Sequence, residues 1–316
     1  MFQTGPIQQP GGVHALRVVY MGMTGAFSIP PLTALLDAGI AVRGVIVPAM
    51  GRGAGADRPA VAPIAPEQPR SPLPLANPYV TPSIVHLAWK HAIPVFEVRR
   101  LAAPETRALF AELGPDLVCV ACFPQRIPSA LLALPPLGVL NLHPSLLPAY
   151  RGPAPLFWAF RNGERTTGVT VHFMDEGLDT GDIAVQAPIT LPDGISGAEA
   201  ERRCATLGAR LLVETVQALE HGTPARRPQS GGSYYPWPTP EDFAIDTAWP
   251  ARRAFNFMRG TAEWGQPYPV EAGGTRLLLG SALAYAADER LNVPCVRSGD
   301  EVRIQFTPGV LRARMA

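Results

Sequence analysis

The sequence is poor in lysine, in cysteine and in long hydrophobic runs. Lys90 is the single lysine among 316 residues, so arginine supplies nearly all of the positive charge, and the formal net charge is only +1. A balance this even provides no strong electrostatic field for a nucleic acid or a membrane surface. No run of about 18 apolar residues occurs, so we expect no transmembrane helix. Residues 1–15 lack the apolar core of a signal peptide, and we expect them to form a flexible N-terminal extension.

The four cysteines offer no disulfide framework. Cys119 and Cys122 form a C-x-x-C pair inside the strand-like run Asp116–Phe123. Residues three apart on a strand face opposite ways, so these thiols cannot converge on a metal ion. We interpret them as small buried hydrophobes and expect a reduced, cytoplasmic setting. No other cluster of Cys and His suggests a metal site.

The first two thirds of the chain have the pattern of an α/β domain. A strand at Leu16–Met21, a helix at Pro31–Ala38 and a strand at Ala41–Val47 give a Rossmann-like opening. It lacks the G-x-G-x-x-G motif, so we infer no dinucleotide. The continuous apolar run Asp116–Phe123 predicts a central strand buried on both faces, as in a mostly parallel sheet. A long amphipathic helix at Ala198–Glu220 should close this domain, which we place at 16–222.

The remainder predicts a linker and a smaller domain. Residues 223–242 are rich in Pro, Gly and Ser, and we interpret them as the linker. A helix is expected at Phe243–Gly260, with Trp249-Pro250 near a boundary. The short strand-like runs that follow, separated by Gly and Asp turns, predict a small β-barrel within 243–316. Residues 48–80 are the least regular part of the first domain, with nine prolines from Pro48 to Pro82 and no persistent period. A loop of this length is usually functional or disordered.

The stretch 141–155 contains the most informative polar residues. The apolar run 138–140 leads into Asn141 and His143 and is cut off by Pro144, which predicts a buried strand that ends at a loop. Side chains two apart on a strand share a face, so Asn141 and His143 should point the same way at the strand end. An amide that donates to an oxyanion and an imidazole that moves a proton would suit acyl-type transfer.

A single His at a strand end is more often structural, but a second segment favours a catalytic site. In 175–183, Gly177 and Gly181 bracket a tight polar loop between two strand-like runs, and Asp179 lies at its centre. A carboxylate in this position could orient the imidazole of His143 and stabilise its charge. We interpret His172, a lone His in the preceding strand, as structural.

These two segments carry a resemblance to a known family. The strings N-L-H-P-S-L-L-P-A-Y-R-G-P-A-P at 141–155 and T-G-V-T-V-H-F-M-D-E-G-L-D-T-G-D-I at 167–183 resemble the formyltransferases that use 10-formyltetrahydrofolate, and among these the methionyl-tRNA formyltransferases most. The resemblance implies catalytic roles for Asn141, His143 and Asp179. It also implies 10-formyltetrahydrofolate as co-substrate, no metal, and a Rossmann-like formyltransferase domain followed by a β-barrel that helps to hold tRNA.

Further binding residues follow from the resemblance. The residues expected to contact the folate are Phe123, Ile127, Ser145, Leu146, Leu147, Pro148 and Asp175. Phe27 matches an aromatic residue near the amine pocket, although a core role is equally open. Arg52 and Arg58, in the irregular 48–80 loop, are candidates for phosphate contacts with tRNA, or belong to a solvated loop. Arg151 would bind a phosphate or a folate carboxylate, or would form a purely structural pair.

The predicted reaction is formyl transfer to a primary amine, with the methionyl amino group of initiator tRNA as the preferred acceptor and a monomer as the expected state. A nucleotide-sugar amine is the first alternative acceptor, and hydrolysis of formyltetrahydrofolate, with water as acceptor, is the second. A non-catalytic folate- or RNA-binding paralogue is disfavoured by the intact Asn, His and Asp set. Residues 246–316 contain nine Arg against seven Asp plus Glu, a net of +2 that is too small for a clear nucleic-acid footprint.

Overall fold

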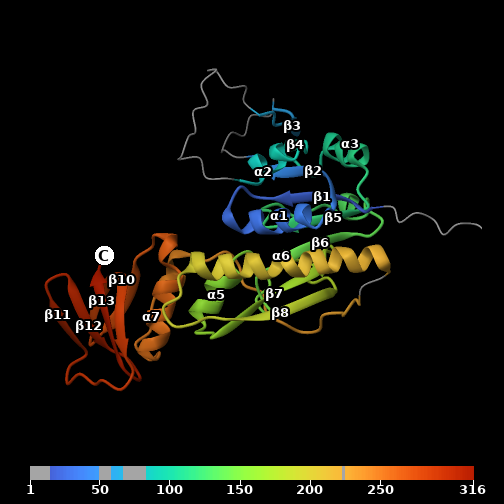
Figure 1. The fold of residues 1–316 in the computed structure, drawn as a ribbon. Helices are drawn as coiled ribbons and strands as arrows, with labels where there is room; N and C mark the ends of the chain where they lie inside the picture. The colour runs from blue at the N-terminus through green and yellow to red at the C-terminus, as the bar shows by residue number, and fades with distance from the viewer. Residues whose placement is uncertain (1–14, 50–57, 67–82, 223–224) are drawn as a thin grey trace, which may run out of the picture.

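The computed structural model describes residues 15–49, 58–66, 83–222 and 225–316, and its strands form two separate sheets (Figure 1). The strands of the first sheet are β1 Arg17–Gly22, β2 Ala41–Pro48, β3 Val61–Pro63, β4 Val95–Val98, β5 Leu117–Ala121, β6 Val139–His143, β7 Thr166–Phe173 and β8 Ile183–Thr190. The strands of the second are β9 Tyr268–Ala272, β10 Thr275–Ala286, β11 Cys295–Ser298, β12 Glu301–Gln305 and β13 Val310–Met315. The α-helices are α1 Ile29–Asp37, α2 Ile84–Lys90, α3 Pro104–Leu113, α4 Ser129–Leu132, α5 Pro155–Arg161, α6 Gly197–His221 and α7 Ala251–Gly260.

The eight-stranded sheet is mostly parallel. Its order is β3-β4-β2-β1-β5-β6-β7-β8, and the five strands from β4 to β6 run parallel, whereas β3, β7 and β8 pair antiparallel with their neighbours. Strand β5 is buried along its whole length, as its continuous apolar run predicts. The α/β, Rossmann-like prediction for the first domain is therefore confirmed.

Helix α6 packs against the strand that carries Asn141 and His143. Ser196 caps its first turn by accepting a hydrogen bond from the backbone N–H of Glu199 at 3.2 Å. A Cβ on Gly208, in the middle of the helix, would lie 2.6 Å from Cδ1 of Leu142 in β6. The absent side chain therefore allows the helix to approach β6 closely and to fix its position.

The C-terminal sheet is a half-barrel with the order β11-β12-β13-β10-β9, in which all neighbouring pairs are antiparallel. Figure 1 shows α7 between this sheet and α5. Aromatic side chains from α5 and α7 join the hydrophobic core of the sheet, and Phe157 of α5 contacts Phe257 of α7 edge to face. Helix α5 of the first part and the C-terminal part of the chain thus share one hydrophobic cluster.

Three local expectations were wrong in detail. The irregular 48–80 region contains the short edge strand β3, which pairs antiparallel with β4. The helix expected from Phe243 begins only at Ala251, directly after Pro250, and is preceded by the 3-10 turn Pro240–Phe243. Strand β5 ends before Cys122, so this thiol is exposed at a left-handed backbone position, whereas Cys119 is buried. No helix in the described ranges is both long enough and apolar enough to cross a membrane.

Candidate active site

The end of β6 presents Asn141 and His143 on the same face. The even positions Leu140 and Leu142 pack into the core that includes α6, so the odd positions face the opposite side of the sheet. Strand β7 runs antiparallel beside β6, and its register places His172 directly opposite Asn141. Two histidines and an amide thus meet at one edge of the two strands.

The tautomer of His143 follows from its hydrogen bond. Its ring is 4% exposed, and Nε2 lies 2.9 Å from the carbonyl oxygen of Tyr150. A carbonyl only accepts, so Nε2 carries the hydrogen. Nδ1 of the neutral ring is therefore free to accept a proton, and it lies 3.7 Å from Oδ1 of Asp179. The geometry makes Nδ1 the basic atom of the site.

Asp179 provides a fixed negative charge beside this ring. Its Oδ2 accepts a hydrogen bond from the backbone N–H of Gly152 at 2.9 Å. Burial alone would raise the pKa of the carboxyl, but the neighbouring rings of His143 and His172 and the Gly152 amide outweigh burial and lower the pKa to about 2. The side chain is an anion at neutral pH.

Burial has the opposite consequence for His143. Loss of hydration lowers the pKa of the imidazole from its ordinary value, although the charge of Asp179 and the bond to Tyr150 act to raise it, and His172 lowers it further. The ring is therefore neutral at neutral pH, which is the state that can take a proton from an attacking amine.

His172, which we interpret from the sequence as structural, lies within this cluster. It is 1% exposed, and its Nδ1 lies 3.1 Å from the carbonyl oxygen of Phe173, so Nδ1 carries the hydrogen. Nε2 is then an acceptor for the Nδ2 amide group of Asn141 at 3.1 Å, and it lies 3.6 Å from Oδ1 of Asp179. The ring fixes which way the amide of Asn141 points.

The second amide hydrogen of Asn141 has only a weak partner. Nδ2 lies 3.5 Å from Oδ1 of Asp179, which is at the limit of a hydrogen bond. A stronger acceptor, such as an oxyanion, can replace this contact while the bond to His172 is kept.

The loop between β7 and β8 depends on its two glycines. A Cβ on Gly181 would lie 1.8 Å from the carbonyl oxygen of Phe173, and one on Gly177 would lie 1.9 Å from Oγ1 of Thr180. Asp175 accepts hydrogen bonds from the Gly177 N–H at 3.0 Å and from the Thr180 hydroxyl at 2.7 Å. The carboxylate of Asp175 therefore shapes the loop that carries Asp179.

Several residues expected to contact folate have side chains that pack inside the protein. Ser145 is buried and donates to the carbonyl of Ala149 at 2.7 Å, and Leu147 is buried with its N–H bonded to Thr170. Ile127 also lies in a core cluster. Phe27, which was expected near the amine pocket, lies in another core cluster. Of the other four residues expected to contact folate, Phe123, Leu146 and Pro148 are partly buried and Asp175 is exposed. Contacts with a ligand along 145–148 would therefore involve mainly backbone groups.

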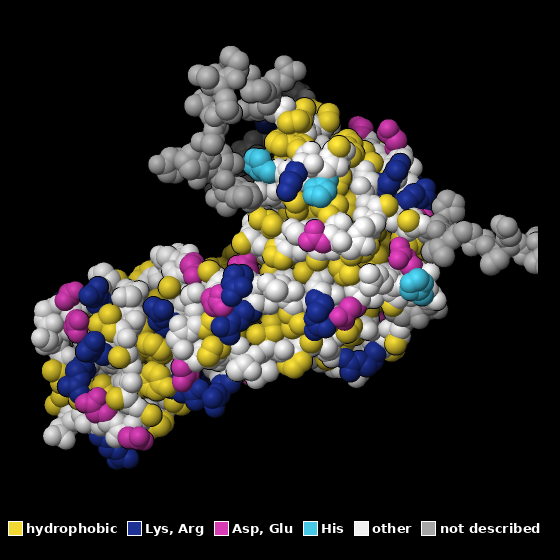
Figure 2. Space-filling model, in the orientation of Figure 1, with side chains coloured by type: hydrophobic (Ala, Val, Ile, Leu, Met, Phe, Trp, Pro, Cys, Tyr) yellow, Lys and Arg dark blue, Asp and Glu magenta, His cyan; other side chains and the backbone are white. Residues whose placement is uncertain are grey.

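Two of the three arginines predicted to contact substrate fall within the described residues. Arg58 is exposed, and Arg52 lies outside the described residues. Arg151 donates to Oε1 of Gln229 from Nε at 3.2 Å and from Nη2 at 2.8 Å. On the face in Figure 2, basic and acidic side chains are interspersed. On α6, Glu199 forms ion pairs with Arg202 and Arg203.

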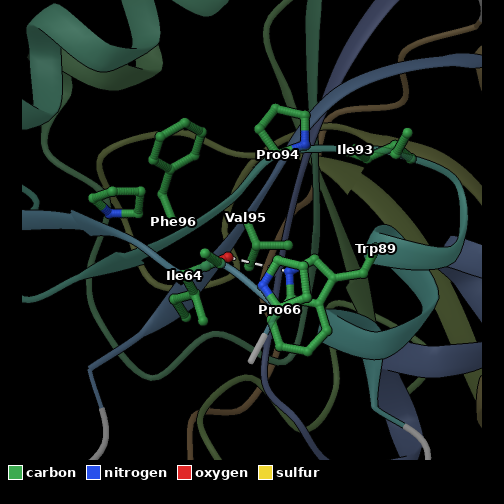
Figure 3. A pocket seen from close by; sticks show the side chains of 10 residues that line it. Ile64, Pro66, Trp89, Ile93, Pro94, Val95 and Phe96 are labelled. Carbon is green, nitrogen blue, oxygen red and sulfur yellow. Dashed lines mark hydrogen bonds between the residues drawn. The ribbon is translucent and has the colours of Figure 1, made fainter. Parts of the chain in front are cut away.

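A separate cavity of about 350 Å³ lies at the β3 edge of the sheet, between α2 and β4 (Figure 3). Its described lining is apolar, with Trp89, Ile93 and Phe96 among its side chains, and the indole N–H of Trp89 donates to the carbonyl of Ile64 at 3.1 Å. Because none of the described side chains that line it is titratable, we assign the chemistry to the cluster at β6 instead. Among the described residues, no group of three or more His, Cys, Asp or Glu side chains is arranged to hold a metal ion.

Comparisons with known proteins identify a family. A sequence model of the formyl transferase family matches residues 65–216. The methionyl-tRNA formyltransferase of Pelotomaculum thermopropionicum is 37% identical over 79% of this chain and 73% of its own length. That of Pelobacter propionicus is 36% identical over 89% of this chain and 82% of its own.

A solved structure has a similar fold. The N-formyltransferase of Helicobacter canadensis, in complex with folinic acid and dTDP-3-aminofucose, superposes with a TM-score of 0.64 over 94% of this chain and 98% of its own. Its sequence identity of 16% shows the fold alone. With the relatives above, the sequence resemblance is confirmed: this chain belongs to the formyltransferase family that includes the methionyl-tRNA formyltransferases.

Proposed function

We propose that this enzyme transfers the formyl group of 10-formyltetrahydrofolate to the methionyl amino group of initiator tRNA. The observation that carries the chemistry is the cluster of Asn141, His143, His172 and Asp179. The side chains in this cluster are linked by contacts of 3.1 to 3.7 Å. The relatives named methionyl-tRNA formyltransferase, at identities above 30% over most of the chain, support the acceptor.

The first step is attack of the neutral amine on the formyl carbon. The carbonyl electron pair moves to oxygen, and the amine proton passes to Nδ1 of His143, the nitrogen left without hydrogen by the Tyr150 bond. Asn141 donates its second amide hydrogen to the new oxyanion while His172 holds the first. Asp179 stabilises the imidazolium 3.7 Å away.

The second step returns the proton. The oxyanion collapses, the bond from carbon to N10 breaks, and His143 gives its proton to the departing nitrogen. The products are the formylated amine and tetrahydrofolate, and His143 is again neutral. No oxidant or reductant is consumed, which matches a cluster that contains only acid–base and hydrogen-bonding groups.

This proposal assigns a role to each part of the chain. Residues 16–222 would bind folate and perform the transfer, 223–242 would act as linker, and 243–316 would help to hold the tRNA. Arg52 and Arg58 remain proposed phosphate contacts. The evenly mixed charge on the face in Figure 2 supports recognition by shape and local contacts rather than by a strong field.

One assay tests the acceptor. Purified protein with 10-formyltetrahydrofolate is offered methionyl initiator tRNA, a dTDP-amino sugar, or water alone, and the formylated product and tetrahydrofolate are quantified. We expect rapid formylation of the charged tRNA and little turnover otherwise. Preferential formylation of the amino sugar, or release of formate with water alone, would refute the acceptor assignment.

A further inference from the structure

The segment that follows α6 returns to the catalytic loops and pairs with them at two places. The backbone groups of Arg227 and Ile183 exchange hydrogen bonds of 3.0 and 2.9 Å at the start of β8. Farther along, the N–H of Arg151 donates to the carbonyl of Ser233, and the N–H of Tyr235 donates to the carbonyl of Arg151, both at 2.9 Å. This segment is therefore held against both loops that border the site.

Gln229 lies between these two pairings and uses its whole side-chain amide. Nε2 donates to the carbonyl oxygens of Asp179 at 3.0 Å and Gly181 at 2.6 Å, and Oε1 accepts both bonds from the guanidinium of Arg151. Both donors and both lone pairs are thus used. Within 225–230, Gln229 is also the one residue that is partly buried rather than exposed.

The backbone of Asp179 needs such a partner. Asp179 has a φ of 56°, in the left-handed region, which costs an ordinary residue roughly 1–2 kcal/mol unless its surroundings hold it. Gln229 holds the carbonyl of this residue, while the adjacent Gly152 N–H holds its carboxylate. Since Arg151 precedes Gly152, one connected set of bonds fixes Asp179 from both ends.

We propose that Gln229 is a positioning residue, which keeps the Asp179 carboxylate at its working distance from His143; the inference rests on the proposed formyl transfer. Gln229 touches none of the reacting atoms and acts through the loop backbone. The segment that joins the two parts of the chain thereby contributes directly to the geometry of the site.

The first test is a double-variant comparison of kcat for formylation of methionyl initiator tRNA. Gln229→Ala should lower kcat about 10- to 100-fold, because a misplacement near 1 Å can cost about 100-fold. In a chain that already carries Asp179→Asn, the same change should cost little further rate. Rate losses that multiply in the double variant would show that Gln229 does not act through Asp179, and would overturn the proposal.

Two further variants distinguish a positioning role of Gln229 from a general disturbance of the segment around it. Gln229→Glu keeps the length and an acceptor for Arg151 but cannot donate to the two carbonyls, so it should lose rate like Gln229→Ala. Wild-type activity in Gln229→Glu would contradict the proposal. Arg227→Ala is the matched control, because it removes the contact of a nearby exposed side chain with Gln186 and leaves the carbonyl of Asp179 untouched. It should keep wild-type kcat.

The second readout is the NMR titration of His143 in the ligand-free protein, assigned by comparison with His143→Gln. The groups that face this ring are the carboxylate of Asp179, the ring of His172 and the carbonyl of Tyr150. Displacement of the carboxylate removes a charge that raises the pKa, so His143 should titrate at lower pH in Gln229→Ala than in wild type. An unchanged titration would contradict the positioning role.

The two proposals fail in different ways. A wild-type protein that makes no formyl-methionyl-tRNA refutes the proposed function, while the titration still measures the effect of Gln229 on His143. A wild-type protein that makes this product, with kcat and titration unchanged in Gln229→Ala, refutes only the positioning role.

Discussion

The charge of Asp179 can be removed with little other change to the site. Asp179→Asn keeps the size of the side chain and an oxygen that can accept from the Gly152 N–H. Asparagine also tolerates the left-handed backbone at this position, where φ is 56°. The substitution therefore tests the negative charge rather than the loop conformation.

The expected loss follows from one distance. Oδ1 of Asp179 lies 3.7 Å from Nδ1 of His143, and the carboxylate is 17% exposed. Unit charges at this separation attract by about 4 kcal/mol at an effective dielectric constant of roughly 20 and by about 1 kcal/mol in bulk water. Since the carboxylate is mostly buried, the loss should lie between these limits. The step that forms the imidazolium should slow by roughly 5- to 1000-fold.

The same substitution should move the pH dependence of kcat/KM in a defined direction. The reaction needs neutral His143, so kcat/KM falls at low pH as this ring takes up a proton. Burial lowers the pKa of His143, and Asp179 acts to raise it. Loss of the carboxylate charge should therefore shift the acidic limb to lower pH while the plateau falls.

The assay is formylation of methionyl initiator tRNA from about pH 4.5 to 9 with wild type, Asp179→Asn and the control Asp182→Asn. The control removes the carboxylate of Asp182, three residues farther along the same loop. Among the described residues, the carboxylate within 4.0 Å of His143 and His172 is that of Asp179, not that of Asp182. It should behave like wild type. A plateau that does not fall in Asp179→Asn, or an acidic limb that moves to higher pH, would refute the proposed role of the charge.

Three further outcomes follow from the structure. Asn141→Ala should lower kcat by about 100- to 1000-fold, because it removes an oxyanion donor; near-normal turnover would exclude that role. His172→Phe should lower kcat at least about 10-fold and destabilise the fold by about 1–3 kcal/mol in urea unfolding, because it leaves a buried amide hydrogen of Asn141 without its acceptor; equal stability would contradict this hydrogen bond. Gly208→Val should cost about 1–3 kcal/mol of unfolding free energy, because its Cβ would meet Leu142; Ala205→Gly, at a neighbouring buried position, gives a reference for a change without a clash.

Alternation along one strand was enough to predict that Asn141 and His143 share a face. The glycines around Asp179 likewise predicted a tight loop, and Gly181 is indeed packed against the backbone of Phe173. His172 could not be placed in this way. Asn141 lies opposite His172 because of the register in which β6 pairs with β7, and the sequence of either strand alone does not give that register.

The contact of Gln229 with Asp179 was even harder to predict from the sequence than that of His172 with Asn141. It lies 50 residues from Asp179 in the chain and within a stretch whose composition predicts only a linker. Edge strand β3 is also too short for any period to be visible among the prolines around it. The late start of α7 was predictable, because the residue before a proline is disfavoured in a helix and Pro250 directly precedes Ala251.

The arrangement of charges explains why rate should depend on this cluster more than binding does. Before the reaction, the carboxylate of Asp179 carries a negative charge, and the ring of His143, whose pKa is lowered by burial, is neutral. Attack of the amine creates an imidazolium and an oxyanion together, so the net charge of the buried site does not change, and no new uncompensated charge must be buried. Asp179 stabilises one of these charges and Asn141 the other, and neither charge exists before attack. Interactions that appear only in the transition state raise kcat, so variants of either residue should change kcat more than the KM of folate or tRNA.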